Sequence, residues 1–406
     1  MKVALISNMN NNYFVLLRYL IDLGVEAKLF RFIDEYDHFT PENDTWYIEK
    51  WEKYIDSLPF TYYNHYETIK NFDKNEVKQK LKDFDILIGS GPSPAYLSEV
   101  DLSLDFFMPY KTGIEYYKDD ISWKHWALSK RIRDFNKLQQ SALKKTKYII
   151  SHNFSDLTHN RIKKLGMKHL PLGVPMVYKE ELKTLDVLKD SQHEVIQRMK
   201  SADYVIMHLG RHLWKRKWTH VIKGHSFINN NANDKVIEAF ATLSQNFKYK
   251  NNLLVLFEYG TQIELSKGLV EKFGVSSQVA WVPLSSRKEI MQIIPHASIG
   301  VGDIAVGVWG GKAFEFLANG VPLINSVSQK QKLRYETLVD CPIPPLIPIK
   351  HSKELYAIFE KYLLNKHLLK AASKQSLEWF IKNDGLKKAE LLLKAFKEEY
   401  ELKKNA

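Results

Sequence analysis

The sequence predicts an α/β protein with two parallel-sheet domains. The chain has 406 residues. This length is greater than a domain with a single hydrophobic core usually has, and it suits two domains of moderate size. Apolar runs typical of buried strands alternate with amphipathic segments typical of helices, and this alternation occurs twice. We expect domains at residues 1–178 and 203–375, with a hinge near 175–203. A C-terminal helix of about 380–406 could pack back on the first domain.

The first alternation begins at the N-terminus. Residues 2–7 (KVALIS) read as a buried strand, 12–24 as an amphipathic helix, and 25–30 as a second strand. Two later strands, 85–91 and 147–153, end in small or polar residues. Strands end this way where a ligand binds at the carboxyl edge of a sheet.

The second alternation follows a charged helical stretch near 181–201. We expect strands at 204–210, 252–260, 278–284, 298–303 and 321–326, and helices at 234–245 and 286–297. The proline-rich stretch 341–350 must be extended, and residues 376–404 read as a pair of helices rich in Lys and Glu.

The composition is that of a soluble globular protein, with 45% hydrophobic and 26% charged residues. No apolar run approaches the ~18 residues of a spanning helix, and the apolar start is too short for a signal peptide. The single cysteine, Cys341, cannot form an internal disulfide. We therefore expect a cytoplasmic protein.

The net charge of +12 favours an anionic partner: nucleic acid, an anionic membrane surface or a phosphorylated small molecule. Residues 46–66 form an aromatic-rich segment that, together with the net positive charge, could contact a membrane. In the alternative interpretation these aromatics are core, and the positive charge only attracts small anions.

A glycine-rich turn precedes a short helix at residues 307–324 (GVWGGKAFEFLANGVPLI). Glycines such as Gly310 and Gly311 allow close backbone approach, and a helix N-terminus with a lysine, Lys312, favours phosphate. Glu315, one turn further on, could accept hydrogen bonds from a ribose diol. The alternative is a structural loop with a glutamate that caps a helix.

A second candidate phosphate site follows the strand at 204–210. Arg211 stands at the strand end and could grip a diphosphate as a bidentate fork, with a later lysine as a point charge. The candidate lysines are Lys215, Lys217 and Lys223. The alternative is a solvated basic loop.

The histidines give weaker signals. His208 lies inside a strand and is expected in the core, His212 could line the phosphate site, and His152 ends a strand with core and cleft positions equally open. Asp83-Phe84-Asp85 precedes a strand, so we interpret it as surface charge. The sequence shows no dense metal-ligand cluster.

The order of these motifs resembles the C-terminal domain of retaining glycosyltransferases of family four. The similar motifs follow one another in the same order: a strand followed by GR and KG, then VIEAF, then VAWVPL, and finally GxxGxxxxExxxxGVPLI. The resemblance is strongest over residues 204–326. The resemblance implies the GT-B fold, in which two Rossmann-like domains face each other across a cleft.

The resemblance also implies site residues. Arg211 and Lys223 match the pair that grips the donor diphosphate, Glu315 matches the ribose ligand, and Pro283 and Leu284 match the strand end that receives the base. In the first domain, residues 108–117, which include Gly113, resemble a loop that faces the sugar. The acceptor or sugar side is expected to include Asn11, Gly113 and His152.

Three features depart from the family pattern. Gly307 stands where many members carry a second glutamate. Asparagines replace the usual Gly-Gly after the first strand, although they can still meet a ligand. An apparent insertion, HSFINNNAN, follows Lys223, so Lys215 and Lys217 stay open as the second phosphate ligand.

The expected function is sugar transfer from a nucleotide diphosphate-sugar, UDP- or GDP-linked, to an acceptor hydroxyl. The resemblance implies retention of anomeric configuration, no metal requirement, and a role in bacterial cell-envelope polysaccharide or glycolipid synthesis with a glycan or lipid-linked acceptor. A nucleotide-sugar 2-epimerase of the same fold and a basic nucleic-acid-binding protein remain alternatives. An NAD enzyme is disfavoured because no strand is followed by GxGxxG.

Overall fold

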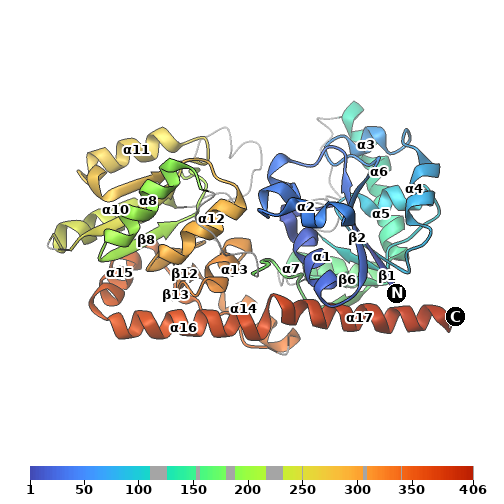
Figure 1. Ribbon diagram of the computed structural model, residues 1–406. Helices are drawn as coiled ribbons and strands as arrows, with labels where there is room; N and C mark the ends of the chain where they lie inside the picture. Colours follow the sequence, from blue (N-terminus) through green and yellow to red (C-terminus); the bar gives the residue numbers. More distant parts are fainter. Residues whose placement is uncertain are drawn as a thin grey trace. The chain divides into compact units, whose positions relative to one another are not determined.

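The structure is a computed structural model that describes residues 1–109, 126–151, 156–179, 188–215, 232–248, 250–304, 309–339 and 341–405. The chain forms two compact units (Figure 1). Unit 1 comprises Met1–Tyr178, Thr337–Asp340 and Asp384–Ala406, and unit 2 comprises Lys179–Glu336 and Cys341–Asn383.

The described part of unit 1 contains a seven-stranded parallel sheet in the order β3-β2-β1-β4-β5-β6-β7. The strands are β1 (Lys2–Ile6), β2 (Glu26–Phe32), β3 (Ile55–Leu58), β4 (Ile86–Ser90), β5 (Phe106–Met108), β6 (Tyr148–Ile150) and β7 (Lys168–Leu170). The longer helices of this unit are α1 (Asn12–Asp22), α4 (Lys74–Leu81), α5 (Ser93–Ser98), α6 (Trp126–Lys145), α7 (Asp156–Leu165) and α17 (Leu386–Lys404).

Strand β1 shows why this sheet is covered on both faces. Val3 and Leu5 belong to one buried cluster, and Ala4 and Ile6 belong to another. Side chains alternate between the two faces of a strand, so an unbroken apolar run such as KVALI can be buried only if helices cover both faces. Residues of α1 and α17 pack in the first cluster, and residues of α4, α5 and α6 pack in the second.

Helix α17 returns from the end of the chain to unit 1. Phe396 packs against Phe106 with ring centroids 4.9 Å apart. Lys403 donates hydrogen bonds of 2.7 Å to the Asp105 carboxylate and to the carbonyl of Asp85. The tail is therefore tied to the edge of the sheet at which β4 and β5 begin.

The aromatic segment 46–66 contributes to the core of unit 1. Trp51 and Phe60 are almost completely buried, and Tyr62 is buried as well. Of its large aromatic side chains only Tyr47 is substantially exposed. The interpretation of this segment as an aromatic membrane contact is therefore wrong, because its rings are used in packing.

The described part of unit 2 contains a six-stranded parallel sheet in the order β10-β9-β8-β11-β12-β13. The strands are β8 (Tyr204–His208), β9 (Asn252–Phe257), β10 (Val279–Val282), β11 (Ile299–Val301), β12 (Leu323–Ser326) and β13 (Ile347–Ile349). Helices of this unit are α8 (Asp190–Ser201), α10 (Asn233–Asn246), α11 (Ile263–Lys272), α12 (Arg287–Ile293), α13 (Gly311–Ala318), α15 (Leu355–Leu364) and α16 (Lys366–Asn383); α14 (Gln329–Leu338) crosses the boundary between the units.

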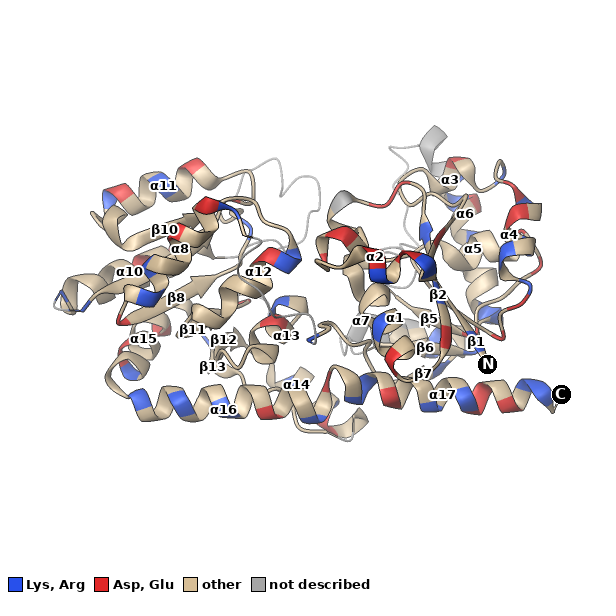
Figure 2. Cartoon of the chain, viewed as in Figure 1, with Lys and Arg blue, Asp and Glu red and all other residues tan. Residues whose placement is uncertain are grey.

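The prediction of an α/β protein with two parallel sheets is confirmed. The strands β3, β5 and β7 were not expected from the sequence, because they are three or four residues long and lack a distinct pattern. Lys and Arg are spread over both units and recur along α16 and α17 (Figure 2). No helix among the described residues is both long and apolar enough to span a bilayer.

Candidate functional site

The topology of unit 2 has a switch point between β8 and β11. From β8 the chain builds β9 and β10 on one side, then crosses to build β11, β12 and β13 on the other. The loops that follow β8 and β11 therefore leave the carboxyl edge of the sheet in opposite directions. In open α/β sheets ligands bind at such a switch point.

Arg211 lies in the loop after β8. Its side chain is exposed, and its guanidinium carbon lies 5.3 Å from the centroid of the Tyr259 ring. The loop is held by a 2.7 Å hydrogen bond from the His212 N–H to the Tyr259 carbonyl. Gly260, with φ +125°, is needed here, because a Cβ would lie 2.6 Å from the His212 backbone.

Gln262 fastens the next part of this loop. Its Oε1 accepts the N–H groups of Trp214 and Lys215, each at 2.8 Å, and its Nε2 donates to the Lys215 carbonyl at 2.8 Å. Its own N–H donates to the His212 carbonyl at 3.0 Å. One buried amide thus fixes the backbone around Arg211. Sequence reasoning missed Gln262, because its partners are distant along the chain.

His212 supports the loop from beneath and does not line its surface. It is fully buried, and its Nδ1 lies 2.8 Å from Ser266 Oγ. Burial lowers the pKa of His212 to about 4, so the ring is neutral at physiological pH. The interpretation of His212 as a phosphate-lining residue is therefore wrong. The expectation that His208 is core is confirmed, since it is buried and its Nδ1 lies 2.8 Å from the Val301 carbonyl.

The second loop leads into the N-terminus of α13. Gly310 precedes the helix in an extended conformation, and a Cβ at Gly310 or Gly311 would meet no described atom within 4 Å. Neither torsion nor packing of the described residues requires glycine at these positions. The free space beside these two glycines lies at the N-terminus of α13, where the first backbone N–H groups favour an anion.

Lys312, in the first turn of α13, is half-buried and makes no hydrogen bond or ion pair with the described residues. The pKa of Lys312 is lowered, chiefly because burial penalises the ammonium; Asp303 and Glu315 oppose this shift, and Arg211 adds to it. Arg211 and Lys312 are therefore close enough to repel each other. A bound anion between them would relieve this repulsion.

Glu315 lies one turn into α13 and is paired. Its Oε1 accepts a 2.9 Å hydrogen bond from Nε of Arg287, and both side chains are largely buried. Arg287 opens α12 behind the loop that follows β10. The pair connects the α13 loop with the loop of Pro283 and Leu284, a link that the sequence did not indicate.

Pro283 and Leu284 directly follow the carboxyl end of β10. The Pro283 carbonyl accepts the Ser285 hydroxyl at 2.7 Å, and the Leu284 side chain is 67% exposed. An exposed leucine beside polar backbone offers an apolar surface for a flat ligand group.

The switch point of unit 1 lies between β1 and β4, and the asparagine loop follows β1. Asn11 has φ +58° and is buried; its amide donates to the Thr40 carbonyl at 3.2 Å and its Oδ1 accepts from Asn8 at 2.7 Å. Its side chain therefore holds the loop. The other expected residues on this side, Gly113 and His152, lie outside the described residues, as do Lys217, Lys223 and Gly307.

A buried carboxyl group, Glu35, supports the same loop. Its Oε1 accepts the Asn8 N–H at 2.7 Å, and its side chain has no exposed surface. Burial raises the pKa of Glu35 to about 7. Sequence reasoning missed this group, because a glutamate after a strand usually lies in solvent.

Acidic clusters do not form a metal site in the described part of the chain, where no group of three or more His, Cys, Asp or Glu side chains could hold an ion. Asp85 accepts the Lys2 N–H at 2.6 Å and lies 3.7 Å from the N-terminal ammonium. Asp83 is exposed. Asp83 is therefore surface charge as expected, whereas Asp85 is only partly exposed and holds the start of β1.

Solved structures with the same architecture cover nearly all of the chain. WaaG, a glycosyltransferase involved in lipopolysaccharide biosynthesis, aligns with a TM-score of 0.54 and 13% identity, over 96% of this chain and 98% of that one. Sucrose-phosphate synthase from Thermosynechococcus elongatus gives 0.60 and 14%, over 99% and 100%. UDP-GlcNAc 2-epimerase from Neisseria meningitidis, bound to UDP-GlcNAc, gives 0.56 and 10%, over 98% and 100%.

These likenesses define the class of fold: the chain has the GT-B architecture of two Rossmann-like units. Neither a protein-family model nor a curated protein matches the sequence.

Proposed function

We propose that the protein is a glycosyltransferase that moves a sugar from a nucleotide diphosphate-sugar to an acceptor hydroxyl. The observation that carries the proposal is the pair of cations at the switch point of unit 2. Arg211 follows β8, and Lys312 stands in the first turn of α13, the helix that follows β11, so both cations lie at the carboxyl edge of the sheet beside the switch point. Such an arrangement matches a diphosphate, whose charge grows as the sugar departs.

The neighbouring groups complete a donor site. Glu315 would take the ribose hydroxyls, and the surface at Pro283 and Leu284 would take the base. Ribose binding would have to share the Glu315 carboxylate with Arg287. Lys223, with Lys215 or Lys217 as substitutes, is the proposed second phosphate ligand. Unit 1 would bind the acceptor, with Gly113 and His152 on that side and Asn11 holding the loop from within.

The resemblance to family-four enzymes supports three further parts of the proposal: retention of anomeric configuration, no divalent ion requirement, and an acceptor of the bacterial cell envelope. In the proposed reaction the acceptor oxygen forms a bond to the anomeric carbon, the bond to the diphosphate breaks, and the acceptor proton leaves with the diphosphate. Arg211 and a lysine stabilise the leaving charge.

A nucleotide-sugar 2-epimerase is the second candidate. It is favoured by the similar folds of UDP-GlcNAc 2-epimerases, including the putative enzyme from Listeria monocytogenes, with a TM-score of 0.59 and 12% identity. The two candidates share the donor site and differ in what happens to the sugar.

The test is a panel of UDP- and GDP-sugars, followed by mass spectrometry for the released nucleotide and NMR for the sugar. Release of nucleotide diphosphate with an unchanged sugar at C2, from hydrolysis or transfer, supports a glycosyltransferase. Inversion at C2 supports the epimerase. If no nucleotide-sugar is bound or consumed, both proposals fail.

A cytoplasmic location beside an anionic membrane surface is proposed on charge alone, since the aromatic segment is core. Each basic residue near such a surface contributes about 1 kcal/mol, and salt weakens the attraction. Sedimentation with anionic and neutral liposomes at low and high salt tests this proposal. Negligible pelleting in all four conditions would indicate a soluble acceptor.

A further inference from the structure

A cavity lies at the amino edge of the unit 2 sheet, opposite the edge of the candidate donor site. Its lining includes Asp203 and Tyr204 where β8 begins, Ala297 and Ser298 before β11, and Val321 and Pro322 before β12. Arg211 and the α13 loop follow β8 and β11 at the carboxyl edge. Strands of about five residues separate the two edges by roughly 15 Å, so this cavity is distinct from the candidate donor site.

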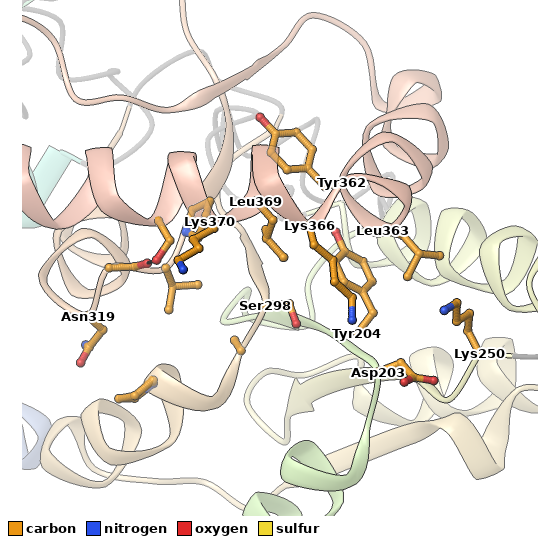
Figure 3. Close-up of a pocket in the computed structure, with 16 residues that line it drawn as sticks. Asp203, Tyr204, Lys250, Ser298, Asn319, Tyr362, Leu363, Lys366, Leu369 and Lys370 are labelled. Atoms are coloured by element: carbon orange, nitrogen blue, oxygen red, sulfur yellow. Dashed lines mark hydrogen bonds between the residues drawn. The ribbon is translucent and has the colours of Figure 1, made fainter.

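The cavity has the dimensions of a small-molecule site. Its volume is about 400 Å³, within the ~300–1,000 Å³ typical of such sites. Helices α15 and α16 supply one wall, which includes Leu363 and Leu369 (Figure 3). Apolar walls of this kind fit a compact organic molecule better than a bare ion.

The charge of the lining is positive. Lys250, Lys366 and Lys370 line the cavity against one acid, Asp203, which already accepts the N–H of Asn251 at 3.0 Å. Lys366 and Lys370 make no hydrogen bond or ion pair with the described residues. The lining therefore favours an anion.

The position of these lysines on α16 strengthens the argument. Lys366 opens the helix, Lys370 follows one turn later, and the first turn contains no acid. Like charges four residues apart repel, and cations are unfavourable near a helix N-terminus. Both costs fall if an anion lies between the two ammonium groups.

A buried hydroxyl provides an independent observation. Tyr204 lines the cavity and is 2% exposed, and its hydroxyl has no hydrogen-bond partner among the described residues. In Figure 3 its ring lies among Lys366, Leu369 and Ser298. An unsatisfied buried hydroxyl destabilises a protein by about 1–3 kcal/mol, which a ligand acceptor would offset.

We propose that this cavity binds a small organic phosphate, with the phosphate group between Lys366 and Lys370 and its organic body against Tyr204 and Leu369. The proposal is independent of the proposed transfer reaction. It concerns a different edge of the sheet and different residues.

The test is calorimetric titration of the full chain with glucose 6-phosphate at low ionic strength, with glucose and inorganic phosphate as parallel probes. Glucose 6-phosphate should bind, glucose should not, and inorganic phosphate should bind more weakly. Saturating UDP should leave this binding unchanged. Absence of binding, equal affinity for inorganic phosphate, or displacement by UDP would overturn the proposal.

Variants locate the site. The double variant Lys366→Met, Lys370→Met keeps the apolar stems and should weaken binding at least tenfold, the loss expected for charge-assisted hydrogen bonds. The matched control is Lys374→Met, one turn further along α16, where the lysine lies 3.8 Å from Glu378. Equal affinity in the double variant and the control would overturn the assignment.

Tyr204→Phe tests the hydroxyl. It should weaken binding of glucose 6-phosphate without lowering the melting temperature of the ligand-free protein. A lower melting temperature would show that the hydroxyl has a partner in the protein, and unchanged affinity would show that it does not meet the ligand. Either result contradicts its role.

Discussion

The chemistry of the candidate donor site is set by a few charged side chains that are held close together. Lys312 loses hydration near Arg211, and only the carboxylates of Asp303 and Glu315 offset this loss. A diphosphate bound by Arg211 and Lys312 would further stabilise both cations. Two predictions concern these residues, and a third concerns a carboxyl group in unit 1.

Arg211→Ala should reduce turnover of the nucleotide-sugar by about 10²–10³-fold, because a group that stabilises the leaving charge is removed. The fold should survive, since the side chain is exposed. Steady-state kinetics and a melting curve check both parts. Lys272→Ala, at an exposed cation at the end of α11, is the matched control. Near-normal turnover of Arg211→Ala would contradict the assignment of Arg211 as a diphosphate ligand.

Glu315→Gln should raise KM for the donor more than it lowers kcat, because a ribose contact is equally strong in the ground and transition states. Arg287→Met removes the same ion pair from the other side. If Glu315 binds ribose, the Glu315 variant should show the larger rise in KM. Equal effects in the two variants would mean that the ion pair alone matters.

Glu35 should make unit 1 less stable as pH rises from about 4.5 to about 7. Its pKa is raised to about 7 in the fold, so the folded state holds the proton more tightly than the unfolded state in this range. Ionisation then costs about 3 kcal/mol. Carbon-13 NMR should find one glutamate titrating near pH 7, absent in Glu35→Gln. A titration near 4.5 would contradict this prediction.

At the scale of elements, the loops after β8 and β11 act as a pair because the sheet reverses its direction of growth between them. The sequence could show that each loop follows a strand. It could not show that Gln262, on the loop after β9, holds the backbone of Trp214 and Lys215.

Gln262→Ala should weaken nucleotide binding about tenfold or more, because three hydrogen bonds that hold the Arg211 loop are lost. Gln262 touches no proposed ligand, so its effect should also appear as faster hydrogen exchange of the Trp214 and Lys215 amides without nucleotide. Lys267→Ala, at a lysine on α11 that pairs with Glu258, serves as control. Unchanged exchange would show that the loop keeps its shape without this side chain.

At the scale of the whole molecule, the proposed site uses fixed cations where other enzymes use an ion. Activity should therefore persist in EDTA, because Arg211 and a lysine neutralise the departing diphosphate. The measurement is turnover before and after chelation, with Mg²⁺ and Mn²⁺ added back. Complete loss that either ion restores would show that this description of the phosphate site is wrong.

Much of the architecture follows from the sequence alone. Apolar runs such as KVALI and YVIMH can be buried only in a sheet covered on both faces, and amphipathic segments between them require parallel strands. The order of the predicted elements likewise placed Arg211 after the end of a strand, and the glycine-rich turn placed Gly310 at the start of a helix.

Only the tertiary structure decided which of these side chains meet. The Arg287–Glu315 pair spans 28 residues, Gln262 reaches back 47 and 48 residues, and the aromatic segment 46–66 lies in a core. The local sequence determines backbone torsion angles and the periodicity of apolar residues, and both describe only a few neighbouring residues. Contacts between distant loops depend on strand order, and strand order depends on how all the apolar faces are buried together.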